Sequence, residues 1–220
     1  MGQSELLRLL VRSFAGTATD RTLPLRLCEA YVDTFQAQGG ALTVAPVPDE
    51  RVAVNTPGTY EQLGPLQEVL GEGPVHEALT DDRLVVMRTG PMVDEYPVFS
   101  HLAEPVGHDV TIYAVPMRAG ASPLGVLSLY VTDEPQARRR EDLQFVADAV
   151  GTVLLDNAHL LDWSEKNLFH RAIGMVIAQL GVRPDEAAAV IRARAFARSR
   201  GLQSTAQDVL ERRVAFFPQN

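Results

Sequence analysis

The chain has 220 residues, of which 46% are hydrophobic and 22% are charged, and its formal net charge is −8. This composition is typical of a globular protein with one large domain or two smaller ones. No stretch approaches the roughly 20 apolar residues of a membrane-spanning helix, and the single cysteine, Cys28, excludes an intramolecular disulfide. We therefore expect a cytoplasmic protein with no membrane partner.

The first two thirds of the chain predict helices followed by a sheet. Apolar residues recur at helical spacing over 6–14 and 27–35, and Gly39 and Gly40 are expected to end the second helix. The segment 58–80 is expected to be helical or irregular, and a short helix is expected near 97–104. Short apolar runs predict one hairpin at 40–45 and 51–55, a strand at 84–88, and a second hairpin at 110–118 and 125–132.

A single long helix is predicted over about 139–180, because this stretch lacks proline and keeps a helical pattern. Its apolar residues also fit a seven-residue repeat over about 143–168, which predicts a parallel coiled-coil homodimer. Gly151 and Gly174 both permit a break. The alternative is that Val146, Val153 and Leu160 form a third stripe that packs the helix onto its own domain. The seam of the dimer helix comprises Leu143, Val150, Leu154, Asn157, Leu161 and Leu168.

After Gly181 the pattern changes to two compact helices, the first opened by Pro184 and the second by a capping box from Ser204 to Gln207. With the end of the long helix they make a three-helix unit. Residues 1–158 carry a net charge of −11, whereas residues 159–220 carry +3. The carboxy-terminal part is therefore the better candidate for binding a polyanion.

The first part of the chain resembles a GAF domain. The resemblance rests on the order of a helix, a hairpin, the motif Leu-Gly-Glu-Gly-Pro at 70–74, a strand, the run at 114–117, the run at 124–130 and a long exit helix. It implies an α+β fold, in which an antiparallel sheet flanked by helices displays a small-molecule pocket. We expect this sensor domain to span 1–155, followed by a helical linker at 156–164.

The carboxy-terminal part, 165–215, resembles an ANTAR domain, the three-helix RNA-binding module of bacterial antitermination regulators. The similarity lies at 171–177, 185–187, 191–195 and 202–209. Ile173 replaces the lysine of the family's Ala-Lys-Gly, and Ser199 stands where the family has asparagine. The resemblance implies that a homodimer binds tandem RNA hairpins.

The arginines of this part are the candidate RNA ligands. Arg192, Phe196 and Arg200 fall on the side of their helix away from Ala187 and Ile191, and an aromatic between guanidiniums is typical of surfaces that stack on unpaired bases. Arg194 and Arg198 project near the apolar stripe. A solvated helix face is the alternative. The predicted RNA-binding residues are Arg171, Arg192, Phe196, Arg198 and Arg200.

No pattern supports catalysis, a metal site or an identified cofactor, because the histidines lack metal-ligand spacing and Cys28 has no second cysteine nearby. The GAF resemblance implies a small-molecule ligand of unknown identity in this domain. Alternatively, Met87, Met92 and Phe99 fill the cavity. The candidate pocket residues are His76, Arg88, Tyr96, His101 and Tyr113.

The sequence as a whole predicts a signal-responsive antitermination regulator in which a GAF sensor controls an ANTAR output. The alternative is a non-catalytic dimeric scaffold protein whose degenerate tail binds a protein partner. A third reading, a GAF-type sulfoxide reductase, requires thiols that one cysteine does not supply.

Overall fold

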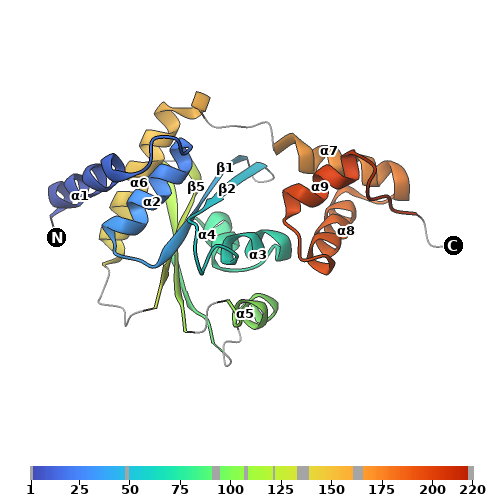
Figure 1. Ribbon diagram of the computed structural model, residues 1–220, viewed down its shortest axis with the longest axis horizontal. Coiled ribbons are helices and arrows are strands. Elements are labelled where there is room, and N and C mark those ends of the chain that lie inside the picture. Colours follow the sequence, from blue (N-terminus) through green and yellow to red (C-terminus); the bar gives the residue numbers. More distant parts are fainter. Residues whose placement is uncertain are drawn as a thin grey trace. The chain divides into compact units, whose positions relative to one another are not determined.

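The computed structural model describes residues 2–47, 50–90, 95–106, 109–120, 122–132, 139–160 and 166–217 (Figure 1). The chain divides into two compact units. One comprises Met1–Gln67 and Gly71–Leu161, and the other comprises Glu68–Leu70 and Asp162–Asn220. Among the described helices, none combines the length and the apolar character needed to cross a membrane.

A five-stranded antiparallel sheet forms the centre of the first unit, in the order β2-β1-β5-β4-β3. The predicted strands and the α+β class are thereby confirmed. The strands are β1 (Gly39–Val47), β2 (Glu50–Asn55), β3 (Val85–Arg88), β4 (Thr111–Ala119) and β5 (Ser122–Val131). Strands β1 and β5 approach closely at Gly125, where a Cβ atom would lie 2.0 Å from the carbonyl oxygen of Thr43.

Helices cover both faces of this sheet (Figure 1). On one face lie α1 (Gln3–Gly16), α2 (Leu23–Thr34) and α6 (Arg140–Asp156), and on the other lie α3 (Leu63–Leu70), α4 (Pro74–Asp81) and α5 (Pro97–Ala103). Proline stands in the first turn of α2, α4 and α5, where its missing N–H leaves no helical bond unmade. Helix α2 ends before the predicted Gly39, since Gln36 adopts a left-handed φ of 51° and Gly39 already begins β1.

The prediction of a single helix over 139–180 is wrong. Helix α6 ends at Asp156, a 3-10 turn (η1) follows at Ala158–Leu160, and α7 begins at Lys166. The side-chain amide of Asn157 donates to the carbonyl oxygen of Val153 at 2.8 Å, and the backbone N–H of Asn157 donates to the same oxygen at 3.2 Å, so both caps of the last turn of α6 come from one residue. Neither Gly151 nor Gly174 marks the break, because both lie inside helices.

Three residues of the predicted dimer seam are buried within their own unit. Leu143, Val150 and Leu154 are at most 1% exposed, since α6 packs against β4 of its own sheet. Gly151 permits this approach, because a Cβ there would already lie 3.0 Å from the carbonyl oxygen of Arg118. Leu168 packs against the core of the second unit, and Leu161 lies outside the described residues. Helix α6 therefore packs onto its own domain, as the alternative expected, but not through the stripe named for it, because Val146 is buried whereas Val153 is 38% exposed.

The second unit contains the three predicted helices, α7 (Lys166–Leu180), α8 (Pro184–Ala197) and α9 (Leu202–Leu210). Small and aliphatic side chains fill the core between them. Helix α8 opens with Pro184, and the Glu186 carboxylate accepts the Arg183 N–H at 2.9 Å. The predicted capping box at Ser204 is wrong, because α9 already begins at Leu202. The core residues are Ala172, Val176, Ala187, Ile191, Ala195, Leu202, Ala206 and Val209.

Candidate nucleic-acid interface

An arginine of α8 lies over an aromatic ring of α7, and a second aromatic residue follows that arginine one turn further along α8. The guanidinium carbon of Arg192 lies 5.7 Å from the ring centroid of Phe169. Phe196 follows Arg192 by one helical turn, so both project from the same flank of α8, and Phe196 is 46% exposed. The buried Nε of Arg192 has no hydrogen-bond partner among the described residues. We call Phe169, Arg192 and Phe196 the stacking cluster.

The sequence predicted Arg192 and Phe196 but missed Phe169. Phe169 occurs in an apolar helical pattern, where it looks like an ordinary core residue. Its ring faces Arg192 only because α7 and α8 pack against each other. The exposed face of a planar guanidinium or an aromatic ring is the kind of surface on which an unpaired base stacks.

The remaining predicted arginines do not join the stacking cluster. Arg171 is exposed on α7, but a spacing of two residues from Phe169 places it about 200° around the helix. Arg198 is exposed at the carboxy-terminal cap of α8. Arg194 is half-buried on the other flank of α8, with an Nε that no described residue accepts from. The five predicted ligands therefore do not share one surface.

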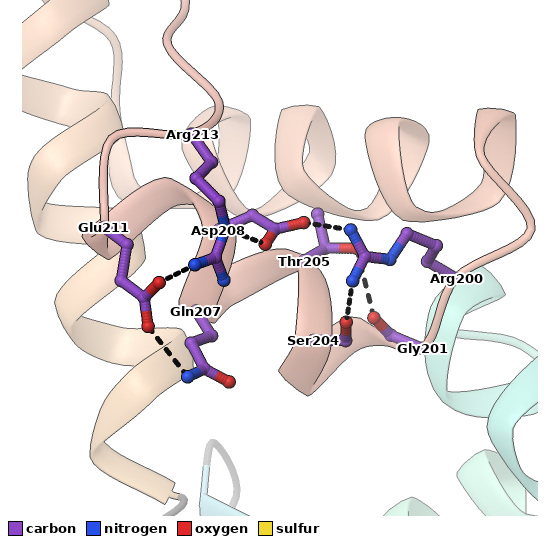
Figure 2. A network of polar contacts seen from close by, with 8 residues as sticks. All are labelled: Arg200, Gly201, Ser204, Thr205, Gln207, Asp208, Glu211 and Arg213. Atoms are coloured by element: carbon purple, nitrogen blue, oxygen red, sulfur yellow. Dashed lines mark hydrogen bonds and ion pairs between the residues drawn. The ribbon is translucent and has the colours of Figure 1, made fainter.

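Arg200 belongs to a separate ion-pair network with two residues that the sequence did not single out (Figure 2). Asp208 on α9 is buried, and each of its carboxylate oxygens accepts one arginine: Oδ2 pairs with Arg200, and Oδ1 accepts from Nε of Arg213 at 2.7 Å. Arg200 also donates to the hydroxyl of Ser204 at 2.6 Å, and Arg213 also pairs with Glu211. We call Arg200, Asp208 and Arg213 the arginine clamp.

The two departures from the ANTAR pattern have structural counterparts. Ile173 is partly buried and packs against the core of its unit, where an aliphatic side chain fits. Ser199 ends α8 with a φ of 48°, in the left-handed region that asparagine tolerates better than serine. A preference for asparagine at this position is therefore explained by backbone geometry without an RNA contact.

The five candidate pocket residues are divided between the two faces of the sheet. Ala114 of β4 packs with Val75 and Ala78 of α4, so its neighbour Tyr113 points to the opposite face, toward α6. Arg88 lies on that opposite face as well and pairs with Asp109. The structure therefore does not bring Arg88 and Tyr113 together with the other three candidates.

The other three candidates lie on α4 and α5. His76 is half-buried on α4, His101 is exposed on α5, and Tyr96 caps α5 with a left-handed φ of 51°. Glu72, from the Leu-Gly-Glu-Gly-Pro motif, ties this region together by accepting the Phe99 N–H at 2.6 Å. Met87 and Phe99 are 2% and 0% exposed, as the filled-cavity alternative requires, whereas Met92 lies outside the described residues.

Two buried polar atoms without partners mark the sheet face beneath α3 and α4. Within the described part of the chain, nothing bonds to the phenol oxygen of Tyr130 or to Oδ1 of Asn55. Their register places both on the same face as Ala114. Burial raises the pKa of Tyr130 well above its usual value, so the phenol is a neutral donor. The sequence missed both, since each lies in an unremarkable strand.

Outside the predicted sites, a cleft of about 720 Å³ runs between α1 and α2, and a smaller one of about 260 Å³ adjoins the start of β1. Both are lined by Glu29, Asp33 and Gln36, and the larger one also by Arg12 and Arg21. Arg21 pairs with Glu29, and Asp33 accepts a bond from the hydroxyl of Ser13. None of the candidate pocket residues lines either cleft.

Titratable groups give no support to redox or metal chemistry in the described residues. Burial raises the pKa of Cys28 from 9.0 to about 12, so the thiolate that such chemistry needs is not formed near neutral pH. Among the residues that the structure describes, no three histidine, cysteine or acidic side chains converge in a geometry suited to a metal ion.

The chain matches no family model and no curated protein. Its structure is similar to the nlh2 GAF domain of A. aeolicus, with a TM-score of 0.47, 8% identity, and coverage of 71% of this chain and 96% of that one. It is also similar to the GAF domain of a phosphoenolpyruvate-protein phosphotransferase from Coxiella burnetii, with a TM-score of 0.45, 13% identity, and coverage of 71% of this chain and 95% of that one. A third similar structure is the N-acylhomoserine lactone dependent LuxR family transcriptional factor CepR2 from Burkholderia cenocepacia. Its TM-score is 0.49 and its identity is 15%, and the match covers 70% of this chain and 98% of that one.

Proposed function

We propose that this chain is a cytoplasmic, non-catalytic regulator whose GAF-like first unit senses a small molecule and whose ANTAR-like second unit binds RNA to control transcription antitermination. Features of both units support the proposal. The motifs quoted from the sequence occur in the order of these families, and the first unit has an antiparallel sheet with helices on both faces. The second unit has three helices and a net positive charge.

The stacking cluster is the observation that carries RNA binding. A guanidinium held over one ring and beside an exposed second ring combines a base-stacking surface with a phosphate donor. A solvated helix face needs neither the stacked geometry nor the exposed aromatic.

Direct binding of the full-length protein to RNAs with two tandem hairpins tests this function, with an unstructured RNA as control and two salt concentrations. Arg192→Gln and Phe196→Ala are each expected to weaken binding about tenfold or more. Arg183→Gln is the matched control, because it removes the same charge from an exposed arginine at the other end of α8. Equal losses from all three variants would contradict a localised interface.

The proposed sensor site lies on the sheet face beneath α3 and α4, where Tyr130 and Asn55 offer a donor and an acceptor without partners. A polar small molecule would satisfy both groups. Thermal melts of the wild type and Tyr130→Phe against a panel of polar metabolites test the site. A ligand that raises the melting temperature of both proteins equally binds elsewhere.

The second candidate function is a dimeric scaffold protein, and the burial of Met87 and Phe99 favours it because these side chains fill space that a ligand would use. In this function the second unit binds a protein, and Phe217, which is 79% exposed, is available for that contact. RNA affinity that falls steeply with salt would count against the scaffold function.

A homodimer is part of both proposals. The buried side chains of α6 do not supply its interface, but α1 exposes Leu7 and Val11, which are 39% and 66% accessible and lie one turn apart. Light scattering of the full chain measures the oligomeric state directly.

A further inference from the structure

Four of the eight arginines of residues 159–220 follow the carboxy-terminal ends of α8 and α9. Arg198 and Arg200 follow the end of α8, and Arg212 and Arg213 follow the end of α9. Against these four arginines stand Asp208 and Glu211, which leaves +2 of the +3 carried by residues 159–220. An excess of positive charge on this part of the unit attracts a polyanion.

Asp208 holds two of these arginines in place, although its own side chain is buried. Its side chain is 7% exposed, whereas those of Arg200 and Arg213 are 49% and 55% exposed. Since each carboxylate oxygen holds one arginine, the two guanidiniums lie on either side of a single buried carboxylate (Figure 2). Ser204 and Glu211 fix the two guanidiniums further. Both long side chains are therefore held in place with their outer parts in solvent.

Each guanidinium keeps N–H donors that these contacts do not use. Arg200 spends Nη1 on Asp208 and Nη2 on Ser204, so its Nε–H is not used in these contacts. Arg213 spends Nε and Nη1, so its Nη2 is not used either. Guanidinium donors match the oxygens of a phosphate group, and a pair that is already ordered loses less conformational entropy on binding.

We propose that the arginine clamp binds a phosphodiester group of the RNA backbone and that Asp208 is the positioning residue of this site. The inference rests on the proposed RNA-binding function and deepens it. The stacking cluster contacts the bases of the RNA, whereas the arginine clamp binds its phosphate backbone and does not discriminate between sequences. Asp208 stays buried beneath the two guanidiniums and does not touch the RNA.

The sign of one charge change tests the positioning role. Asp208→Asn removes a negative charge, so long-range electrostatics alone would strengthen RNA binding. Release of both arginines from their fixed positions weakens RNA binding. We therefore expect the RNA affinity of Asp208→Asn to fall roughly three- to tenfold, as for the loss of a phosphate contact. Asp185→Asn removes the same charge from an exposed carboxylate at the start of α8, outside the clamp and its supporting contacts, and we expect unchanged or slightly tighter binding. Tighter binding by both variants would overturn the positioning role.

Arg213→Gln tests the contact itself. Its affinity is expected to fall by a similar factor for every RNA sequence, and the slope of log K against log salt is expected to shrink by about 0.7–0.9 for the lost phosphate contact. Thermal melts report whether each variant is folded. If Asp208→Asn does not fold, Arg213→Gln carries the test alone, and an unchanged affinity and slope would overturn the clamp.

A probe without RNA separates this inference from the proposed function. NMR signals of the arginine Nε–H groups in the full chain are followed during titration with inorganic phosphate and then with RNA. Shifts at Arg200 and Arg213 with both probes support the clamp. Shifts with phosphate but no binding of any RNA would overturn the RNA function and leave an anion site. RNA binding that leaves both signals unmoved would overturn the clamp and retain the function.

Discussion

The guanidinium of Arg192 lies over the ring of Phe169, with 5.7 Å between the guanidinium carbon and the ring centroid, although the two residues belong to different helices. Lysine keeps the charge but lacks the flat face that stacks on a ring. We therefore expect Arg192→Lys to weaken RNA binding nearly as much as Arg192→Gln, whereas a charge-only role predicts full retention. Fluorescence anisotropy with one labelled hairpin RNA distinguishes the two outcomes.

Leu154 and Val11 separate packing within a protomer from contact between protomers. Leu154 is 1% exposed, so Leu154→Ala is expected to lower the free energy of unfolding by about 2–5 kcal/mol without changing the mass of the native particle. Val11 is 66% exposed, so Val11→Asp is expected to leave the unfolding midpoint nearly unchanged while halving that mass. Denaturant titration and light scattering supply the two measurements. A native wild-type monomer would contradict the dimer.

Cys28 predicts a loss of stability at alkaline pH. Its pKa is raised from 9.0 to about 12 in the folded protein, so the native state keeps the proton that the unfolded state releases. The stabilisation is complete below pH 9 and is lost as the pH rises toward 12. Cys28→Ala is expected to show a shallower decline than the wild type in urea unfolding at successive pH values, and parallel curves would contradict the assignment.

Cys28 also predicts slow thiol chemistry. Because the thiol is buried and protonated, alkylation of the native protein at pH 8 is expected to proceed at least about a hundredfold more slowly than alkylation in denaturant. Mass spectrometry over time follows the reaction. Rapid labelling of the native protein would show that α2 opens readily.

Gly125 predicts a severe steric effect in the centre of the sheet. A Cβ at this position would lie 2.0 Å from the carbonyl oxygen of Thr43, which is backbone and cannot rotate away. Gly125→Ala is expected to cost more than about 3 kcal/mol or to abolish folding, because β5 would have to move off β1. Gly120→Ala is the control, since no atom lies within 4 Å of a Cβ there. Its backbone strain, at a φ of +64°, is expected to cost only about 1 kcal/mol.

Elements whose signals are local were predicted well. The hairpin of β4 and β5 follows from two apolar runs around a turn, and α8 follows from Pro184 and its helical pattern. Helix ends were predicted less well. The prediction of helix ends relied on proline and glycine, and the stretch 139–180 contains no such signal near residue 156. Helix α6 nevertheless ends at Asp156, so these residue types do not mark its end.

The candidate sites depended on contacts that no sequence pattern encodes. A heptad-like stripe on α6 fits a partner helix and a sheet equally well, and only the packing of α6 on β4 decides that Leu154 is buried within the protomer. Tyr113 was named as a pocket residue together with His76 on α4, but strand alternation points it to the opposite face of the sheet.

The sequence by itself therefore determined the class of each element, the antiparallel character of the hairpins and the contrast between an acidic first part and a basic second part, because periodicity, turn residues and charge are properties of short segments. The tertiary structure alone decided that Phe169 faces Arg192 and that Asp208 joins Arg200 to Arg213. These contacts join different helices and loops, so they exist only once the helices have packed.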